Sequence, residues 1–441
     1  MNNNQETNTS SLGLSQVEKL LCFSADVEAG EGKNILLLMF SLFFLLVTAY
    51  LLKPVKEALI LTQGSAELRS YTIALQVVVI FLILPAYGYF SKSINSKKFM
   101  IYCSLFFSGN LFIFYLLGLL GVNFSIVFFI WLGSFGILMI SQFWAFASQV
   151  FSGVSGERLF PLIAIGASLG GWAGSAIAKI LLTSYTPYDL ILISSIPLLL
   201  ALFLACQIHA KVPALVSIKS DSLDTLAGGF KLIVKNRYLI LIAIFVILIN
   251  WCISTSDYLL ALLVEKHYLK EINAGTILVS KESYIGMFYS NFYFWVNCLG
   301  LFIQTFFVAR LIKFFGFHIA FVITPVLLFL GYSFLAFYPI ISLFRLFKVT
   351  ENGLNYSLQS TTLQILYTPT SRREKYEARA FIDSVCWKTG DLLQAITVFV
   401  AINYLNFIPK DFVFLNISLA LVMIVLAYFI SKEYLIKTSS I

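Results

Sequence analysis

Charged residues are scarce in this chain. They account for 12% of its 441 residues, whereas hydrophobic residues account for 59%. A typical soluble domain carries about 25% charged residues, so this shortage excludes a soluble protein of ordinary composition. Apolar stretches close to the ~20 residues that cross a bilayer recur along the whole length. The sequence therefore predicts a polytopic α-helical membrane protein whose main partner is the lipid bilayer.

The chain also lacks the motifs of several enzyme classes. Its six cysteines are scattered, mostly within apolar stretches, and none has the spacing of a metal site. No glycine-rich loop is followed by Lys-Ser or Lys-Thr, so there is no phosphate loop and any nucleotide would be a cargo. No Ser-His-Asp arrangement stands out. We therefore expect no catalytic residue, no metal and no cofactor, and we keep a polytopic membrane enzyme or receptor as a remote alternative.

Twelve apolar stretches have the length of membrane spans. They lie near 34–62, 70–90, 99–120, 124–151, 161–183, 189–209, 238–262, 285–309, 316–337, 340–368, 379–405 and 411–430. The longest hydrophilic connection, 210–237, contains the amphipathic segment SDSLDTLAGGFKLIVKNR. This layout predicts an all-α membrane protein with two six-helix halves, 34–209 and 238–430. It is the layout of major-facilitator transporters, in which substrate binds between the halves near the midplane.

The net charge of +8 reflects topology rather than nucleic-acid binding. Lysines and arginines gather in the connections after the second, fourth, sixth, eighth and tenth spans, as the positive-inside rule expects. The connections 121–123, 184–188 and 338–339 contain no lysine or arginine. We therefore predict no nucleic-acid partner, and a topology in which both ends, 1–33 and 431–441, are cytosolic.

Lys53, Lys56 and Glu57 interrupt the apolar run of the first span, beside Pro54. Their spacing of three and four residues places them on one helical face, and Pro54 would kink the helix there. Ionisable groups inside a membrane span are costly and usually face a wet cavity or a partner. The alternative is that the span ends at Leu52 and the lysines extend to the outer interface.

The tenth predicted span carries a polar stripe. A helical wheel places its members within about 80° of one another: Arg345, Lys348, Asn352, Asn355 and Gln359. Glu351 lies next to Lys348 and could pair with it or with Arg345. Such a stripe would be costly against lipid, so we expect it to line a cavity. The alternative is an internal ion-pair network that only holds the bundle together.

The eleventh span places further polar residues on one face: Asp383, Trp387, Asp391 and Gln394, with Lys388 beside them. The candidates for binding an anionic substrate are then Lys53, Lys56, Arg345, Lys348, Asn355 and Lys388. The candidates for gating or ion coupling are Glu57, Glu351, Asp383, Asp391 and, near the outer end of the seventh span, Asp257.

Gly166, Gly170 and Gly174 follow one another at four-residue spacing in the fifth span, and Ala178 continues the series. Small residues at this spacing let two membrane helices approach closely. We therefore interpret this face as a helix-packing surface.

Three segments resemble the ATP/ADP translocase family of intracellular bacteria and plastids, including its shorter bacterial relatives. They are YLLKPVKEALILT in the first span, SQFWAFASQVFSGVSGERLFPLIAIGASLGG after the fourth, and NYSLQSTTLQILYTPTSRREKYEARAFIDSVCWKTGDLLQ in the tenth and eleventh. In this comparison Lys56 falls on the family's first-span lysine, and Lys388 lies near its lysine in the eleventh span. The family often has Lys-Glu where this chain has Leu363-Gln364, and a lysine where it has Asn355. WKTGDLLQ is closer to the shorter relatives.

The resemblance implies a major-facilitator-like fold and exchange of nucleotides across a bacterial inner membrane. The leading hypothesis is a monomeric antiporter that exchanges ATP for ADP by alternating access, with basic residues of a central cavity binding the phosphates. The alternative is a proton-coupled major-facilitator transporter of another organic anion or metabolite. In that case Asp391 or Glu57 would be the proton site.

Overall fold

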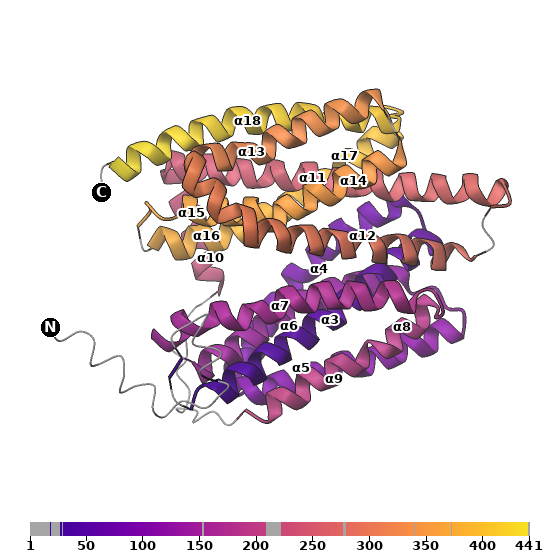
Figure 1. The fold of residues 1–441 in the computed structure, drawn as a ribbon, viewed down its shortest axis with the longest axis horizontal. Helices are drawn as coiled ribbons and strands as arrows, with labels where there is room; N and C mark the ends of the chain where they lie inside the picture. The colour runs from indigo at the N-terminus through magenta and orange to yellow at the C-terminus, as the bar shows by residue number, and fades with distance from the viewer. Residues whose placement is uncertain are drawn as a thin grey trace. The chain divides into compact units, whose positions relative to one another are not determined.

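The computed structural model describes residues 18, 27–28, 30–151, 154–208, 222–276, 279–338, 340–371 and 373–439. Most of the predicted segment 1–33, residue 209 and the first part of the predicted linker, 210–221, lie outside these residues. The described secondary structure is helical (Figure 1), without a strand. The helices divide between two compact units. Unit 1 comprises Met1–Lys56 and Ala86–Ser217, and unit 2 comprises Glu57–Pro85 and Ile218–Ile441.

Unit 1 contains the first part of α3 and most of the N-terminal helices. Their bounds are Gly32–Gln63 for α3, Ser96–Leu119 for α5, Ser125–Val150 for α6, Val154–Leu181 for α7, Pro187–Ile193 for α8 and Ser195–Cys206 for α9. Helix α5 packs against α6, α8 and α9. The Thr186 side chain accepts a hydrogen bond from the Asp189 backbone and its own backbone donates to the Asp189 carboxylate. This reciprocal cap satisfies exposed donors and explains why α8 begins there.

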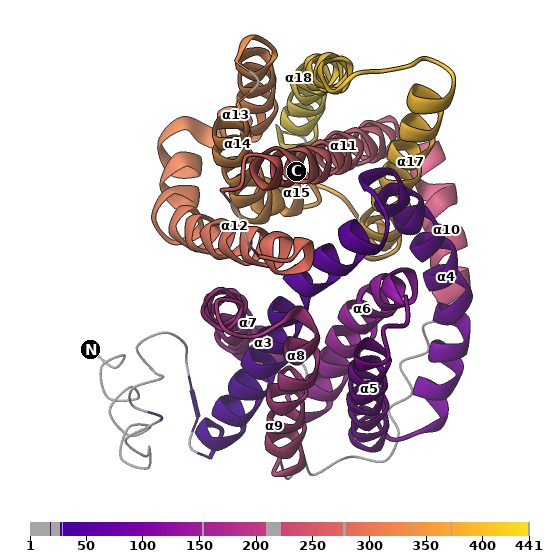
Figure 2. The same ribbon diagram turned by 90° about the vertical axis from the view of Figure 1, so that its right-hand side faces the viewer.

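Unit 2 contains most of α4 and all later helices. Their bounds are Ala66–Ser93 for α4, Ser222–Lys235 for α10, Arg237–Asn273 for α11, Lys281–Ile303 for α12, Gln304–Val308 for η2, Ala309–Phe337 for α13, Ile341–Leu354 for α14, Asn355–Gln359 for η3, Ser360–Leu366 for α15, Glu374–Ala378 for η4, Arg379–Phe381 for α16, Ile382–Cys386 for η5, Trp387–Asn403 for α17 and Pro409–Ser439 for α18. Helix α11 contacts α14, α17 and α18, and α13 lies beside α18 (Figure 2). The η elements are π-helical turns within longer helices.

The predicted all-α fold with twelve crossings is confirmed. Within the described residues, ten helical stretches are long and apolar enough to cross a membrane. One of them, Lys281–Phe337, has 57 residues and breaks at Gly316, whose φ of 78° is not helical. Because about 20 residues suffice for a crossing, this stretch holds two. The helical segment 341–366 is not among the ten, because its many polar residues, charged ones as well as asparagines and glutamines, make it less apolar, and it supplies the twelfth.

Helix α3 continues through Pro54 to Gln63, so the first helix does not end at Leu52. From Glu57 onward, the end of α3 and the first part of α4 belong to unit 2. Two long-range hydrogen bonds tie α4 there. The Ala66 backbone donates to the Glu265 carboxylate at 3.0 Å, and the Gln394 amide donates to the Ser70 hydroxyl at 3.0 Å. The compact units therefore differ from the predicted halves in the segment 57–85.

Helix α10 lies within the predicted linker and is amphipathic, as its sequence indicates. It packs against η4 and α16. Gly229 allows this close approach, because a Cβ atom there would meet the backbone carbonyl of Glu377. The Phe230 and Phe381 rings lie 5.7 Å apart at the same contact. Helix α10 is thus held against η4 and α16 by the Phe230–Phe381 contact and by the close approach that Gly229 permits.

A candidate substrate cavity in unit 2

A cavity of about 280 Å³ lies within unit 2. Its walls come from α4, α11, α12, α14, η3 and α17, which are far apart in the sequence. Three of the predicted site residues line it directly: Asp257, Asn355 and Asp391. Asn352 and Trp387, which the helical wheels placed beside them, line it as well. The polar faces expected on the tenth and eleventh spans therefore meet in one place.

One face of α11 supplies much of the polar wall. Asn250, Ser254 and Asp257 all line the cavity. Their spacing of four and three residues is the spacing of neighbours on one helical face. Around these residues the helix buries apolar side chains on its other faces, with Ile249, Cys252 and Leu260 at most 1% exposed. The hydrophobic contacts of α11 thus fix the orientation of its polar stripe.

Asp391 is the best-bound carboxylate on the cavity wall. It accepts hydrogen bonds from the Asn250 amide at 2.9 Å and the Ser254 hydroxyl at 2.8 Å, and it pairs with the Lys388 ammonium at 2.9 Å. The Asn250 amide also donates to the Trp387 carbonyl oxygen at 2.6 Å. Two neutral donors and one cation hold the carboxylate, while the Lys388 side chain keeps 24% of its surface exposed.

Lys348 has a completely buried side chain beside the cavity. Its ammonium group contacts the carboxylates of Asp257 and Glu351, both at 2.8 Å, and the carbonyl oxygen of Ile253 at 3.1 Å. An ammonium group has three N–H donors, so all of them are used. Lys348 can therefore bind a substrate anion only by releasing one of these acceptors. It positions Asp257, whose side chain is 33% exposed and lines the cavity.

Glu351 belongs to the same buried network. Its carboxylate accepts from the Tyr332 hydroxyl at 2.8 Å and the Ser256 hydroxyl at 3.0 Å, in addition to Lys348. With 1% of the side chain exposed, it does not face the cavity. The structure thus pairs Glu351 with Lys348, one of the two partners that the sequence offered, and gives it the surroundings of an internal ion pair.

Arg69 brings a positive charge to the cavity from α4. Its Nε and Nη2 atoms donate to the Glu57 carboxylate at 2.6 and 3.1 Å, and both side chains are almost completely buried. The third nitrogen, Nη1, is buried and has no hydrogen-bond partner among the described residues. The hydroxyl of Tyr289, another lining residue, is buried and unpartnered in the same way. Leaving a buried donor unsatisfied costs about 1–3 kcal/mol, so two donors here require an acceptor that the described chain does not supply.

The charges around the cavity are closely balanced. The cations Arg69, Lys348 and Lys388 pair with four carboxylates, those of Glu57, Asp257, Glu351 and Asp391. An excess of positive charge, which a phosphate site needs, is therefore not present in this network. The acidic groups hold the empty cavity near neutrality.

Other predicted site residues lie elsewhere. Lys53 and Lys56 belong to unit 1, where their ammonium groups lie 3.7 Å from the centre of the Tyr50 ring and 4.1 Å from that of Phe129. The guanidinium of Arg345 lies 5.3 Å from the centre of a phenylalanine ring of α12. These three residues do not line the cavity of unit 2.

Asp383 also lies away from the cavity, although the helical wheel grouped it with Trp387 and Asp391. It pairs with Arg379 at 3.3 Å and lines a separate cavity. Asp383 lies in the π-helical turn η5, Ile382–Cys386, eight residues before Asp391. It therefore stands about 12 Å from Asp391 along the helix axis and reaches a different level of the bundle. Gln359, at the end of η3, is buried and does not line the cavity.

Five residues that line the cavity were not predicted from the sequence: Arg69, Asn250, Ser254, Tyr289 and Tyr293. A signal existed for two of them, because Asn250 and Ser254 share the helical face of Asp257. Arg69 stands close to the start of its span and resembles an interfacial residue in the sequence. Its role depends on Glu57, on the preceding helix, and only the folded chain shows that contact.

The glycines of α7 lie against α3 in unit 1. A Cβ atom at Gly166 or Gly170 would meet a backbone carbonyl oxygen, that of Met39 or Phe43 respectively, and at Gly174 it would lie 2.8 Å from the carbonyl oxygen of Val47. The four-residue spacing thus brings the backbones of two helices together along several turns.

Comparison with known proteins places the chain by its fold. No family model and no curated protein matches the sequence. Among solved structures, the nucleoside transporter NupG is 13% identical with a TM-score of 0.64, covering 91% of this chain and 98% of that chain. The POT family transporter PepTSo is 12% identical with a TM-score of 0.60, covering 91% and 98%. A D-xylose-proton symporter is 14% identical with a TM-score of 0.56, covering 89% and 96%. The chain therefore has the major-facilitator fold and is a multi-pass membrane protein.

Proposed function

We propose that the chain is a secondary transporter that moves a small polar organic solute across the membrane by alternating access. Solved structures with the same fold are described as a nucleoside transporter, a peptide transporter and a xylose-proton symporter. Major-facilitator proteins bind their solutes near the midplane, and polar groups within membrane spans mark such pathways. The proposal includes a bacterial inner membrane and cytosolic ends, which the distribution of lysine and arginine supports.

The observation that carries the proposal is the pair of unpartnered donors on the cavity wall. Arg69 Nη1 and the Tyr289 hydroxyl are buried and lack an acceptor among the described residues. A solute with a carboxylate, carbonyl or hydroxyl group can supply that acceptor. The cavity volume of about 280 Å³ lies near the lower end of the ~300–1,000 Å³ typical of ligand pockets, which favours a small solute.

The carboxylates of the cavity support coupling to protons. Asp391 lines the cavity beside Lys388, whose ammonium group is partly exposed. A proton that binds to the Asp391 carboxylate would remove the negative charge that pairs with Lys388. Protonation of Asp391 would therefore release the Lys388 side chain from this ion pair. Glu57 is a poorer proton site, because it is 0% exposed and accepts two hydrogen bonds from Arg69. We therefore assign the proton site to Asp391.

Exchange of ATP for ADP is the second candidate, and the three family-like segments favour it. In this reading Lys388 is a better phosphate ligand than Lys348, because it is partly exposed and pairs with one carboxylate rather than two. Lys56, which belongs to unit 1, is the other lysine that the family resemblance marks. A nucleotide would, however, bring several negative charges to a network in which carboxylates already outnumber cations. The geometry of unit 2 therefore favours proton-coupled transport of a solute with less charge.

Proteoliposomes distinguish the two candidates. Purified protein is reconstituted with a pH-sensitive dye in the lumen, and uridine, xylose, dialanine or ATP is added outside. We expect one of the first three probes to acidify the lumen in protein-containing liposomes and not in empty ones. If no probe moves protons and internal ADP stimulates the uptake of labelled ATP, exchange replaces the proton-coupled mechanism. If neither response occurs, the transporter proposal fails for these solutes.

The exchange mechanism has its own test in two lysines. It requires that Lys56→Ala and Lys388→Ala each abolish ADP-stimulated ATP uptake while the proteins remain folded. Uptake at the wild-type rate in both variants would exclude phosphate binding by these residues.

A further inference from the structure

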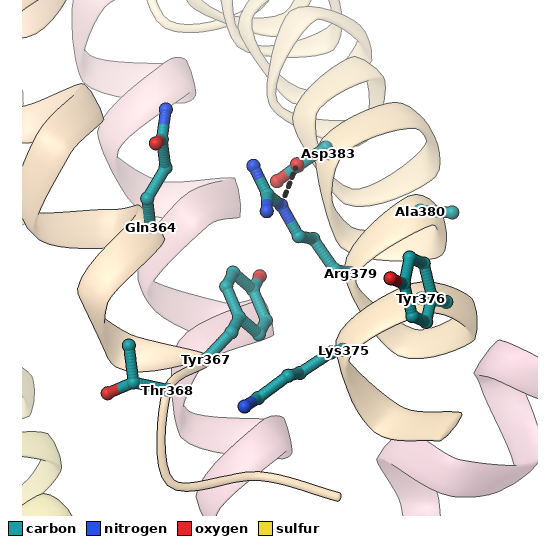
Figure 3. A pocket seen from close by; sticks show the side chains of 8 residues that line it. All are labelled: Gln364, Tyr367, Thr368, Lys375, Tyr376, Arg379, Ala380 and Asp383. Carbon is teal, nitrogen blue, oxygen red and sulfur yellow. Dashed lines mark hydrogen bonds and ion pairs between the residues drawn. The ribbon is translucent and has the colours of Figure 1, made fainter. Parts of the chain in front are cut away.

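A second cavity of unit 2, of about 490 Å³, shares no residue with the substrate cavity. It lies between the end of α15 and the turn formed by η4 and α16 (Figure 3). Figure 3 shows Lys375 and Arg379 reaching from one wall toward Tyr367 on the other. The transport mechanism proposed above uses none of these side chains.

The cavity holds a cation without a counterion. Lys375 is exposed and forms no ion pair or side-chain hydrogen bond with any described residue. Arg379 lies one turn further along and pairs with Asp383 at 3.3 Å, with 42% and 54% of the two side chains exposed. An ion pair so open to solvent contributes little, so an incoming anion can compete with Asp383 for Arg379. The cavity therefore has an excess of positive charge.

Tyr367 adds a hydrogen-bond donor to this charge. The residue is only 4% exposed, and its hydroxyl is buried without a partner among the described residues. Its ring lies 5.7 Å from the guanidinium of Arg379. A lysine, an arginine and a hydroxyl on facing walls form a donor set that suits a phosphate group, because charge-assisted hydrogen bonds to phosphate oxygens are strong.

The location of the cavity indicates the source of the phosphate. Lys375, Tyr376 and Arg379 stand near the start of Glu374–Asn403, a helix long and apolar enough to cross a membrane. Tyr376 lines the cavity and is 69% exposed, as expected for an aromatic residue at the headgroup level. Basic pockets between membrane helices on the cytoplasmic side bind the headgroups of anionic lipids. We propose that this cavity binds the phosphate of an anionic phospholipid headgroup.

Lipid titration followed by native mass spectrometry tests this proposal. Purified full-length protein in a neutral detergent is titrated with phosphatidylglycerol and, separately, with phosphatidylcholine. We expect one phosphatidylglycerol molecule to bind in preference to phosphatidylcholine. Lys375→Gln should weaken that binding about fivefold, the effect of one lysine at a membrane surface. Tyr367→Phe should weaken it by a similar factor without lowering the unfolding temperature, because the lost hydroxyl has no partner in the chain.

The matched control is Lys410→Gln, which removes one exposed lysine at the start of α18, outside the cavity. It should leave the affinity for phosphatidylglycerol unchanged. If Lys375→Gln and Lys410→Gln weaken phosphatidylglycerol binding equally, the loss follows from the net charge of the protein and not from the cavity, and the proposal is overturned. Unchanged affinity in both Lys375→Gln and Tyr367→Phe would overturn it as well. If inorganic phosphate at millimolar concentration binds and phosphatidylglycerol shows no preference, the site belongs to a soluble phosphate compound instead.

Discussion

Removing the charge of Lys348 should destabilise unit 2 strongly. In Lys348→Met the side-chain volume is nearly kept, but the carboxylates of Asp257 and Glu351 lose the cation that lies 2.8 Å from each. Glu351 is 1% exposed and cannot recover the interaction from water. Breaking a buried ion pair from one side costs about 3–5 kcal/mol, because a buried charge is left uncompensated. For a unit of this size that corresponds to a fall in unfolding temperature on the order of 10 °C.

Thermal unfolding of the purified protein in detergent measures this effect. Lys388→Met is the matched control, because it removes the same charge from a partly exposed pair and leaves Asp391 with its bonds from Asn250 and Ser254. We expect this control to lower the unfolding temperature less than Lys348→Met does, because Asp391 keeps two hydrogen-bond donors and the site borders the cavity, whereas Glu351 is sealed from water. The double variant Lys348→Met/Glu351→Gln should recover part of the loss. A single Lys348→Met variant as stable as the control would refute the buried network.

Three further substitutions, the last with a matched control, probe the solute contact, Asp383 and the packing of α7. Tyr289→Phe should raise the KM for the transported solute about tenfold without lowering the unfolding temperature, because a charged or polar acceptor loses one hydrogen bond. Asp383→Asn should leave transport at the wild-type rate, since Asp383 lines the other cavity and not the substrate cavity. A large loss of transport activity would mean that Asp383 takes part in transport. Gly170→Val should destabilise the protein by about 1–3 kcal/mol, because its side chain would collide with the carbonyl oxygen of Phe43. Gly136→Ala, with open space around its Cβ atom, should cost nothing.

The helices were predictable because their signal is local. Long apolar runs predicted the crossings, and Gly316 coincides with the predicted start of the ninth span. The polar stripe of the tenth span was predicted to line a cavity, and Asn352 and Asn355 of that stripe do so. In each case residues three or four apart were sufficient, because the α-helix fixes which of them share a face.

The pairing of charges was not predictable, because it depends on contacts between helices. Lys348 was considered a phosphate ligand, but its donors are taken by Asp257 and Ile253 on α11 and by Glu351 on its own helix. Glu57 was grouped with the lysines of its own helix, whereas the structure pairs it with Arg69 on the next. Distance along the helix was a second obstacle. A helical wheel shows which residues share a face but not how far apart they lie along the axis, and Asp383 stands eight residues, about 12 Å of helix, from Asp391.

The most direct test of the central claim compares wild-type protein with Asp391→Asn in the same proteoliposomes. The solute that acidifies the lumen in the wild type is supplied both with a proton gradient and, in a separate assay, at equal concentrations for counterflow. If Asp391 is the proton site, Asp391→Asn will lose solute-driven acidification and keep counterflow of labelled solute, because the amide stands in for the protonated acid. Acidification at the wild-type rate in Asp391→Asn would contradict the account.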